Sequence, residues 1–512
     1  MLRPYVRMDA STGSFPANMP AIITLDGHSL TIADVVAVAR GNAPVALDAK
    51  ALKAVTASRR VVEAAVNSGQ TMYGVNTGFG KLAHVRIPPD QARQLQLNLI
   101  RSHASGVGDP LPVDAVRAMM LLRANVLVRG TSGVRPALPE LLVEMLNQKI
   151  HPTVPSQGSV GASGDLAPLS HLALAMIGEG DVRVPRPITL EAKEGIAFVN
   201  GTQAQTGLAA LLVHDAWRLW RTAHGAAAMS LEAVRGSPEP FDPRIHDARP
   251  HPFQQRSATL LRGLLVESAI RESHRDNDPR VQDAYSLRCT PQVLGAVGEG
   301  LAFAERIVTT ELNAATDNPL VFGDDVLSGG NFHGQPIALA LDVIAIALTT
   351  LAGLAERRLE RIVNPDLSSG LPAFLARDPG LESGFMTPQI AAAALVADCR
   401  VLATPASVQS VPTEGNQEDV VPMGMTAAWK AGRILGNAER IVAIELLAGA
   451  QGLEYLLPLT PGRGVARLHA AVRREAAALT GDRPLTADIE RIAQGIRAGT
   501  FEPEGGGVGG TA

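Results

Sequence analysis

The chain has 512 residues, of which 46% are hydrophobic and 4% aromatic, so its core must be built from alanine, leucine, valine and isoleucine, a composition that suits packed helices. Its 46 basic and 50 acidic residues give a formal net charge of −4, which argues against a nucleic-acid partner or an anionic membrane surface. With only Cys289 and Cys399 present, neither a disulfide framework nor a structural zinc site is expected.

The N-terminal half is predicted to be helical, with two glycine-rich loops. Residues 1–20 lack a continuous apolar run and are interpreted as a disordered leader rather than a secretory signal, which makes a cytoplasmic location the default. Thr31 is expected to cap the helix that starts at Ile32. The glycine-rich loops are residues 73–80 and 158–165, and prolines break the pattern over 182–197. Helices are predicted over 30–39, 49–66, 114–128, 138–146, 169–177 and 204–234.

The second half is predicted to form a helical bundle. Residues 236–253 contain five prolines and are predicted to be irregular. Residues 336–355 are long and apolar enough to cross a bilayer, but the centre of a large bundle requires the same composition, and we interpret them as a buried helix. Helices are predicted over 260–273, 291–313, 336–355, 388–402 and 427–450, with a charged helical tail from 461 to 497.

The predicted domain organisation follows from these elements. It comprises a leader (1–20), an N-terminal domain with the second glycine-rich loop (21–220), a central helical bundle (221–460), a helical tail (461–503) and a disordered glycine-rich end (504–512).

The loop at 158–165 reads Gly-Ser-Val-Gly-Ala-Ser-Gly-Asp. A phosphate-binding loop would have a lysine after its last glycine, and a nucleophile elbow would have a glycine two residues after Ser163; Asp165 stands at both positions. Glycine content alone favours a simple connection, with Asp165 capping the next helix. The longer stretch that continues Leu-Ala-Pro-Leu-Ser-His resembles the signature of the histidine and aromatic amino-acid ammonia-lyases.

This resemblance implies an electrophile. In that family the Ala-Ser-Gly tripeptide cyclises and dehydrates to 4-methylidene-imidazol-5-one (MIO), so Ala162, Ser163 and Gly164 would form this group with no metal and no external cofactor. Gly164 suits the reaction because no Cβ obstructs its nitrogen near the Ala162 carbonyl. The implied fold is mainly α, with a long central helix bundle and a smaller N-terminal domain that carries the electrophile loop. The implied assembly is a homotetramer whose sites combine residues from more than one subunit.

Elimination of ammonia also needs a base, because the Cβ hydrogen of an amino acid is very weakly acidic. Residues 73–80 read Tyr-Gly-Val-Asn-Thr-Gly-Phe-Gly and match the family's loop, which makes Tyr73 a candidate base. A tyrosine is a poor base unless its pKa is lowered, so a buried tyrosine with a hydrogen-bonded hydroxyl is the alternative interpretation.

The candidate carboxylate clamp is Arg288, because a guanidinium binds a carboxylate through two parallel hydrogen bonds. A salt-bridged surface arginine is the alternative. If residues 282–288 are helical, Gln282, Tyr285 and Arg288 share one face. The resemblance places all three in the site, with Asn200 as a further contact and Phe332 as a pocket aromatic.

Substrate choice is indicated by two motifs that match the histidine branch of the family. Histidine lyases carry Ser-His where this chain has Ser102-His103, and they carry a glutamate at Glu418; Met386 also fits their imidazole-binding version. An imidazole needs hydrogen-bonding partners, and a site with such groups buried rejects a phenyl ring. The resemblance implies that His103 contacts the imidazole and that Glu418 is a contact or the base, although each alone could be a buried core residue.

The sequence therefore predicts an enzyme of histidine catabolism that converts L-histidine to trans-urocanate and ammonia. Residues 420–422 read Val-Val-Pro where histidine lyases have His-Val-Ser, which resembles the tyrosine and phenylalanine branches. A lyase or aminomutase acting on tyrosine or phenylalanine is thus the alternative within the family. A catalytically silent helical scaffold and a membrane protein built on 336–355 are alternatives of other classes.

Overall fold

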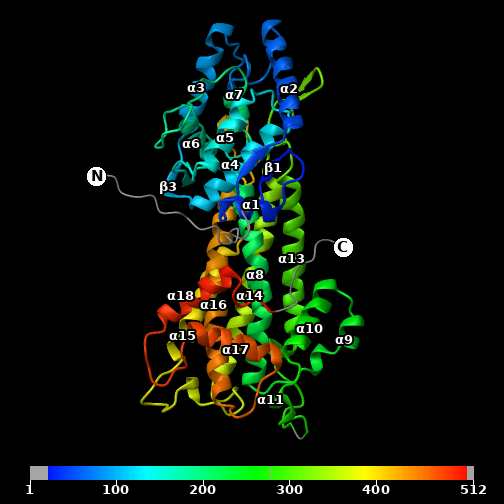
Figure 1. Ribbon diagram of the computed structural model, residues 1–512, viewed down its shortest axis with the longest axis vertical. Helices are drawn as coiled ribbons and strands as arrows, with labels where there is room; N and C mark the ends of the chain where they lie inside the picture. Colours follow the sequence, from blue (N-terminus) through cyan, green and yellow to red (C-terminus); the bar gives the residue numbers. More distant parts are fainter. Residues whose placement is uncertain (1–20, 277, 504–512) are drawn as a thin grey trace, which may run out of the picture.

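Four long helices run along the molecule and form its core (Figure 1). They are α8 (Gln203–Ala233), α13 (Thr290–Glu311), α14 (Gln335–Val363) and α16 (Gly424–Glu454). α14 packs against α8, α13 and α16, and α16 also packs against α8. This computed structural model describes residues 21–276 and 278–503, so the predicted leader and the predicted disordered end lie outside the described residues.

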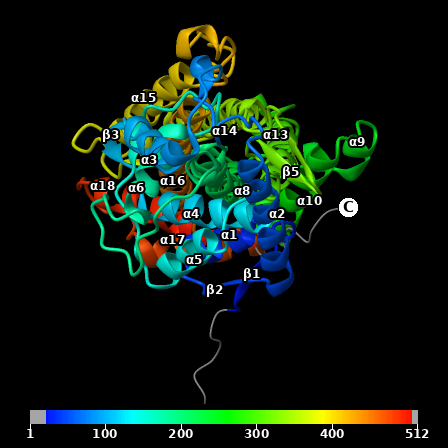
Figure 2. The same cartoon turned by 90° about the horizontal axis from the view of Figure 1, so that it is seen from above.

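The N-terminal segments gather at one end of the long helices (Figures 1 and 2). Strands β1 and β2 pair in parallel, whereas β3 pairs with β4 and β5 with β6 in antiparallel fashion. The elements of this part are β1 (Ile23–Leu25), α1 (Ile32–Ala39), β2 (Val45–Leu47), α2 (Ala49–Asn67), α3 (Ala92–His103), β3 (Val107–Pro110), α4 (Val113–Val128), α5 (Ala137–Asn147), β4 (Pro155–Gln157), α6 (Leu166–Met176), α7 (Glu194–Val199), β5 (Leu320–Phe322) and β6 (Asp325–Leu327).

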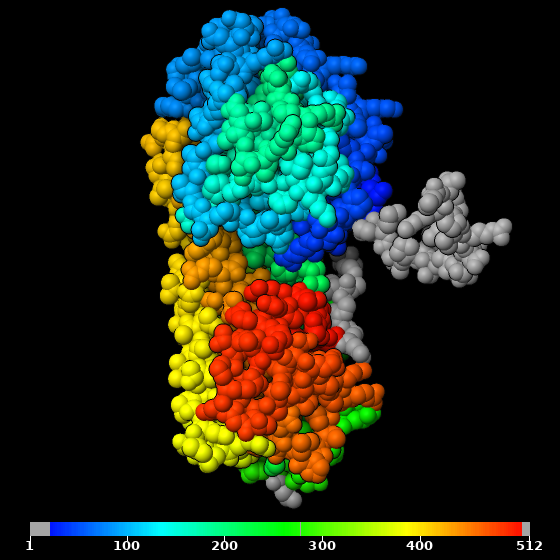
Figure 3. All heavy atoms as spheres, turned by 60° about the vertical axis from the view of Figure 1, so that its left-hand side comes forward, coloured from blue at the N-terminus to red at the C-terminus, as the bar shows by residue number. Residues whose placement is uncertain are grey.

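The opposite end is built from shorter helices, and the C-terminal segments cover one side of it (Figure 3). These helices are α9 (Pro243–Asp247), α10 (Pro252–Leu264), α11 (Ala269–Glu272), α12 (Tyr285–Arg288), α15 (Met386–Leu402), α17 (Arg463–Glu475) and α18 (Thr486–Ala498).

The mainly α fold is confirmed, and the differences from the prediction are local. The predicted cap at Thr31 forms a capping box with Asp34: the Asp34 N–H donates to Thr31 Oγ1, and the Asp34 carboxylate accepts from the Thr31 N–H. Residues 236–253 are not irregular throughout, because α9 and α10 both begin at a proline there. Proline is favoured in a first helical turn, where its missing N–H has no helical partner anyway.

Two other predictions from the sequence concern the long helices. The proposed domain boundary at 220/221 falls inside α8, so the N-terminal part and the bundle share one continuous helix. α14 meets the length and composition of a membrane-spanning helix, and 61% of its most apolar stretch is buried against other helices of the chain. That packing is typical of a core helix.

A buried ion pair ties the long helices together. Arg358 on α14 donates from Nε to Glu445 Oε1 at 2.5 Å and from Nη2 to Glu445 Oε2 at 2.9 Å, and neither side chain is exposed. Ser230 on α8 donates to the same carboxylate at 2.7 Å. Three helices are thereby fixed in register at one point of the core.

We expect Arg358→Met to lower the free energy of unfolding by about 3–5 kcal/mol, because it leaves the Glu445 carboxylate buried without its cation. The double variant Arg358→Met/Glu445→Leu removes both charges and should recover most of that loss. Denaturant unfolding of both variants tests this, and a double variant as unstable as the single one would contradict it.

Candidate active site

The loop 158–165 connects β4 to α6 and has a backbone that only glycine adopts easily. Gly158, Gly161 and Gly164 have φ values of +121°, +75° and +81°. Gly164 forms an isolated parallel bridge with Gly201, and a Cβ built on Gly164 would lie 2.3 Å from the Gly201 nitrogen and oxygen. A side chain at position 164 would therefore displace the loop from the residues that lead into α8.

Asn200 and Gly201 hold the tripeptide Ala162-Ser163-Gly164 in place. Asn200 Nδ2 donates to the Ser163 carbonyl at 2.7 Å, and the Asp165 N–H donates to the Gly201 carbonyl at 2.7 Å. Asn200 Oδ1 is buried and has no hydrogen-bond partner among the described residues. The amide of Asn200 thus has a free acceptor beside the tripeptide.

Asp165 occupies the cap position of α6, but its side chain does not cap that helix. Its carboxylate instead accepts from the Gln205 N–H at 2.9 Å in the first turn of α8, and from Ser159 Oγ at 3.1 Å. This corrects the expected local cap: the carboxylate satisfies a free N–H of a different, longer helix. Burial raises the pKa of Asp165 to about 6, against the opposing effect of these hydrogen bonds.

The starts of two further helices contact the same loop. Gly334, at the start of α14, donates its N–H to the Gly161 carbonyl at 3.0 Å, and Met423, at the start of α16, donates to the Val160 carbonyl at 2.8 Å. Helix N-termini carry partial positive charge, so the starts of α6, α8, α14 and α16 place such charge around the loop, and the Asp165 carboxylate at the start of α8 opposes it.

A cavity of about 470 Å³ opens beside the tripeptide. Most of the residues singled out from the sequence line it, although they come from segments far apart in the chain. Those in the lining are Tyr73, His103, Ala162, Ser163, Asn200, Phe332 and Glu418, and Gly164 follows Ser163 in the same loop.

Tyr73 lies among acidic groups in this cavity. Its hydroxyl accepts from the Gly80 N–H at 3.0 Å. Burial raises the pKa of Tyr73, and the negative charges of Glu414 and Glu418 raise it further. Glu418 Oε2 accepts from Thr413 Oγ1 at 2.6 Å, whereas its Oε1 is buried with no partner among the described residues. Glu418 therefore offers a free acceptor, whereas Tyr73 keeps its proton at neutral pH.

His103 stands at the end of α3 as a neutral imidazole. Its Nδ1 lies 2.9 Å from the Leu99 carbonyl, which can only accept, so Nδ1 carries the proton and Nε2 is left as an acceptor. Burial lowers the pKa of His103, which keeps the ring uncharged at neutral pH.

Sequence reasoning did not single out several polar residues of the cavity lining, among them Glu414 and Asn318. Glu414 lies four residues before Glu418, so its place in the same motif was an available signal. No such signal marked Asn318, because it lies in the segment before β5 and outside the motifs. Its Oδ1 accepts from the Gly329 N–H at 2.7 Å.

Four predicted residues lie elsewhere in the single chain: Gln282, Tyr285, Arg288 and Met386 do not line the cavity. The segment 278–283 is bonded to the opposite end of α8, since Arg280 donates to the Val234 carbonyl at 2.9 Å. α8 has 31 residues and so spans roughly 46 Å at 1.5 Å per residue. One chain therefore keeps the tripeptide and the predicted clamp near opposite ends of one helix.

The predicted helix over 282–288 is shorter than expected, because α12 begins only at Tyr285 and leaves Gln282 outside it. The Arg288 guanidinium stacks on the Tyr285 ring, 4.7 Å from its centroid. Tyr285 is 70% exposed, and Arg288 Nε is buried with no partner among the described residues. This pair forms a cationic, partly unsatisfied feature at the surface of the chain.

The family model described as "Aromatic amino acid lyase" matches residues 30–474. The chain belongs to the aromatic amino acid lyase family. Among members of this family, the histidine ammonia-lyase of Koribacter versatilis is 51% identical over 504 residues, covering 93% of this chain and 98% of that protein.

Solved structures of aromatic amino acid lyase relatives have the same fold. The histidine ammonia-lyase of Trypanosoma cruzi is 42% identical, with a TM-score of 0.87 and coverage of 94% of each chain. The tyrosine aminomutase of Streptomyces globisporus is 40% identical, with a TM-score of 0.89 and coverage of 94% of this chain and 98% of that one. The mainly helical architecture is thus shared by lyases and aminomutases.

Proposed function

We propose that this ammonia-lyase converts L-histidine to trans-urocanate and ammonia in histidine catabolism. The observation that carries the proposal is that His103 and Glu418 face the same cavity as Ala162 and Ser163. His103 Nε2 and Glu418 Oε1 are two acceptors in the cavity, and the N–H of a neutral substrate imidazole can donate to either of them. A phenyl ring could donate to neither acceptor and would leave the buried Glu418 Oε1 unpaired, which disfavours phenylalanine. Relatives such as the Koribacter versatilis histidine ammonia-lyase support the same assignment.

The tripeptide loop fits the MIO group that the family implies. Gly164 has a positive φ and packs where a Cβ would clash with Gly201, while Asn200 has a free amide oxygen beside the loop. Ala162, Ser163 and Gly164 would form the group, and Asn200 and Gly201 would hold it. Once formed, it supplies the electrophile without which an ordinary side-chain base cannot remove the Cβ hydrogen.

The cavity's own residues bind the substrate and move the proton. Tyr73 and Glu418 are the two candidates for the base. Because burial and the charges of Glu414 and Glu418 raise its pKa, Tyr73 acts as a base only in the fraction of molecules in which its hydroxyl is ionised. Glu418 Oε1 is a buried acceptor without a partner among the described residues, and Phe332 supplies an apolar wall.

The carboxylate clamp is proposed to come from another copy of the chain. Arg288 is held near the far end of α8 from Ser163, and a side chain cannot cover the roughly 46 Å length of that helix.

Large apolar side chains on α14 and α15, including Ile346, Ile390 and Val401, remain exposed in the single chain and would be covered by such a copy. We therefore propose a homotetramer in which sites combine Gln282, Tyr285, Arg288 and Met386 with the cavity of a neighbour. The cytoplasmic location stays a prediction.

A second candidate is a tyrosine or phenylalanine lyase or aminomutase. It is favoured by Val420-Val421-Pro422 and by the likeness to the Streptomyces globisporus tyrosine aminomutase. In the structure Val420 lines the cavity, Val421 is buried, and Pro422 Cγ lies 3.4 Å from where a Cβ on Gly161 would stand, so this departure lies next to the electrophile loop.

The substrate is tested by offering the purified protein L-histidine, L-tyrosine and L-phenylalanine separately. We expect growth of the near-ultraviolet absorbance of a conjugated acrylate with L-histidine only, and no growth for Ser163→Ala. Reaction with tyrosine or phenylalanine alone, or formation of a β-amino acid seen by chromatography, would favour the second candidate. No reaction with any of the three would favour a silent scaffold.

Sharing of sites between copies is tested by complementation. Ser163→Ala and Arg288→Met should each be nearly inactive alone, because one lacks the electrophile and the other the clamp. Co-expressed with different affinity tags, equal amounts should give mixed assemblies in which about a quarter of the sites hold both intact residues. Activity that stays at background in doubly purified assemblies would show that both residues come from one chain.

The electrostatic coupling around Tyr73 predicts a pH effect of Glu414→Gln. Removing this negative charge lowers the pKa of Tyr73, so ionised tyrosine appears at lower pH. If Tyr73 is the base, the alkaline rise in kcat/KM should move to lower pH in this variant. An unmoved profile would exclude Tyr73 as the group that limits the rate and leave Glu418 as the base.

A further inference from the structure

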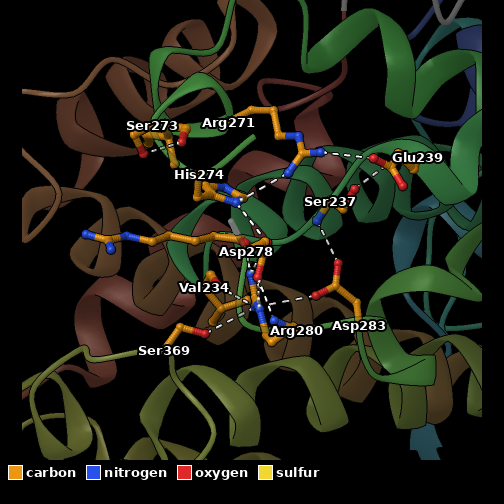
Figure 4. Close-up of polar contacts among 12 residues, drawn as sticks. Val234, Ser237, Glu239, Arg271, Ser273, His274, Asp278, Arg280, Asp283 and Ser369 are labelled. Atoms are coloured by element: carbon orange, nitrogen blue, oxygen red, sulfur yellow. Dashed lines mark hydrogen bonds and ion pairs between the residues drawn. The ribbon is translucent and has the colours of Figure 1, made fainter. Parts of the chain in front are cut away.

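The segment between α11 and α12 leads directly into the proposed clamp residues Gln282 and Arg288, and a cluster of charged side chains holds it (Figure 4). This segment makes no contact with the cavity described above. Its geometry nevertheless decides where the clamp stands, because Gln282 is two residues beyond Arg280 in sequence.

Arg280 is the centre of this cluster (Figure 4). Its Nη1 donates to the Val234 carbonyl at 2.9 Å and to Ser369 Oγ at 3.2 Å, and its Nη2 donates to the Arg235 carbonyl. Val234 and Arg235 directly follow α8, and Ser369 follows α14. One guanidinium therefore joins the segment to the ends of two core helices.

The acceptors on α8 are suited to a cation. The last carbonyls of a helix lack partners within the helix and carry partial negative charge. A guanidinium has five donors in a fixed fork and can serve several of these acceptors at once, whereas an ammonium is a single point charge. Arginine rather than lysine is thus the residue that this junction requires.

Two aspartates fix Arg280 from the side of the segment itself. The Arg280 N–H and Nε donate to Asp278 Oδ1 at 2.9 and 3.3 Å. Asp283 Oδ1 lies 3.4 Å from Arg280 Nη1, while its Oδ2 accepts from the Ser237 N–H at 2.6 Å. Only 3% of the Asp283 side chain is exposed. Gln282 therefore stands between a buried anchor at 283 and the arginine at 280.

We propose that Arg280 is a positioning residue for the substrate carboxylate: it fixes the segment that carries Gln282 and Arg288 to the C-terminal end of α8 and does not touch the substrate. This inference rests on the proposed function. The anchor matters because a clamp supplied to a neighbouring copy must be presented at a fixed place, and displacement by about 1 Å can cost up to about 100-fold in rate.

The test separates carboxylate binding from general damage to the protein. In Arg280→Met and Arg280→Lys, kcat/KM for L-histidine should fall about 10- to 100-fold. The inhibition constant of L-histidinol, which has a hydroxymethyl group in place of the carboxylate, should change less than about twofold, a change too small to signal damage to the site. The near-ultraviolet absorbance of the prosthetic group and the assembly size should stay as in the unaltered protein.

Arg275→Met is the matched control, since Arg275 lies in the same segment, is 58% exposed and donates to Glu272 in α11. It should leave both constants unchanged. Ser369→Ala removes one acceptor of Arg280 and should shift kcat/KM in the same direction by a smaller factor, which keeps the test available if Arg280→Met does not fold.

The inference is overturned if the Arg280 variants keep their kcat/KM, or if kcat/KM and L-histidinol binding weaken together. A different result marks failure of the proposed function: the unaltered protein would then neither react with L-histidine nor bind L-histidinol, and the inference would fall with it.

Discussion

The rigid length of α8 is the constraint on which the rest of the site depends. Its first turn receives Asp165 and lies beside Asn200 and Gly201, which hold the electrophile loop. Its last carbonyls receive Arg280, which leads into the clamp segment. A helix does not shorten or fold back, so the loop 158–165 and the segment that leads to Arg288 stay near opposite ends of α8 within one chain. Apolar side chains on α14 and α15 also remain exposed in the single chain, and in the proposed assembly another copy would cover them.

The electrostatics of the cavity divide into two zones. Around the tripeptide lie the starts of α6, α8, α14 and α16, where the Gly334 and Met423 N–H groups donate to carbonyls of the loop and the Gln205 N–H donates to the Asp165 carboxylate. Across the cavity, Glu414 and Glu418 place negative charge near Tyr73 and raise its pKa. An amino acid carries an ammonium and a ring that can donate hydrogen bonds, and both suit the acidic side. Under the proposed function, the acidic side of the cavity would receive these groups of the substrate.

Much of this could be predicted from the sequence, and the limits have physical causes. The helical core followed from periodicity, and Tyr73, His103, Ser163 and Glu418 followed from long motifs that the cavity indeed brings together. α9 and the part of α10 before Leu260 were missed because proline density was taken as a sign of irregularity, although proline favours a first helical turn. Asp165 was expected to cap its neighbour because sequence shows only local partners; its actual partner, Gln205, is forty residues away.

The continuity of α8 also sets its tolerance to change in length. Each residue of a helix turns the chain by about 100°, so one inserted residue between Gln205 and Val234 would rotate one end of α8 against the other by more than a quarter of a circle while lengthening it by only about 1.5 Å. The faces that bury alanine and leucine against α14 and α16 would then fall out of phase with those partners. α8 therefore fixes both the distance and the rotation between its two ends. Relatives with the same arrangement at these ends must preserve the number of residues in α8 more strictly than its composition.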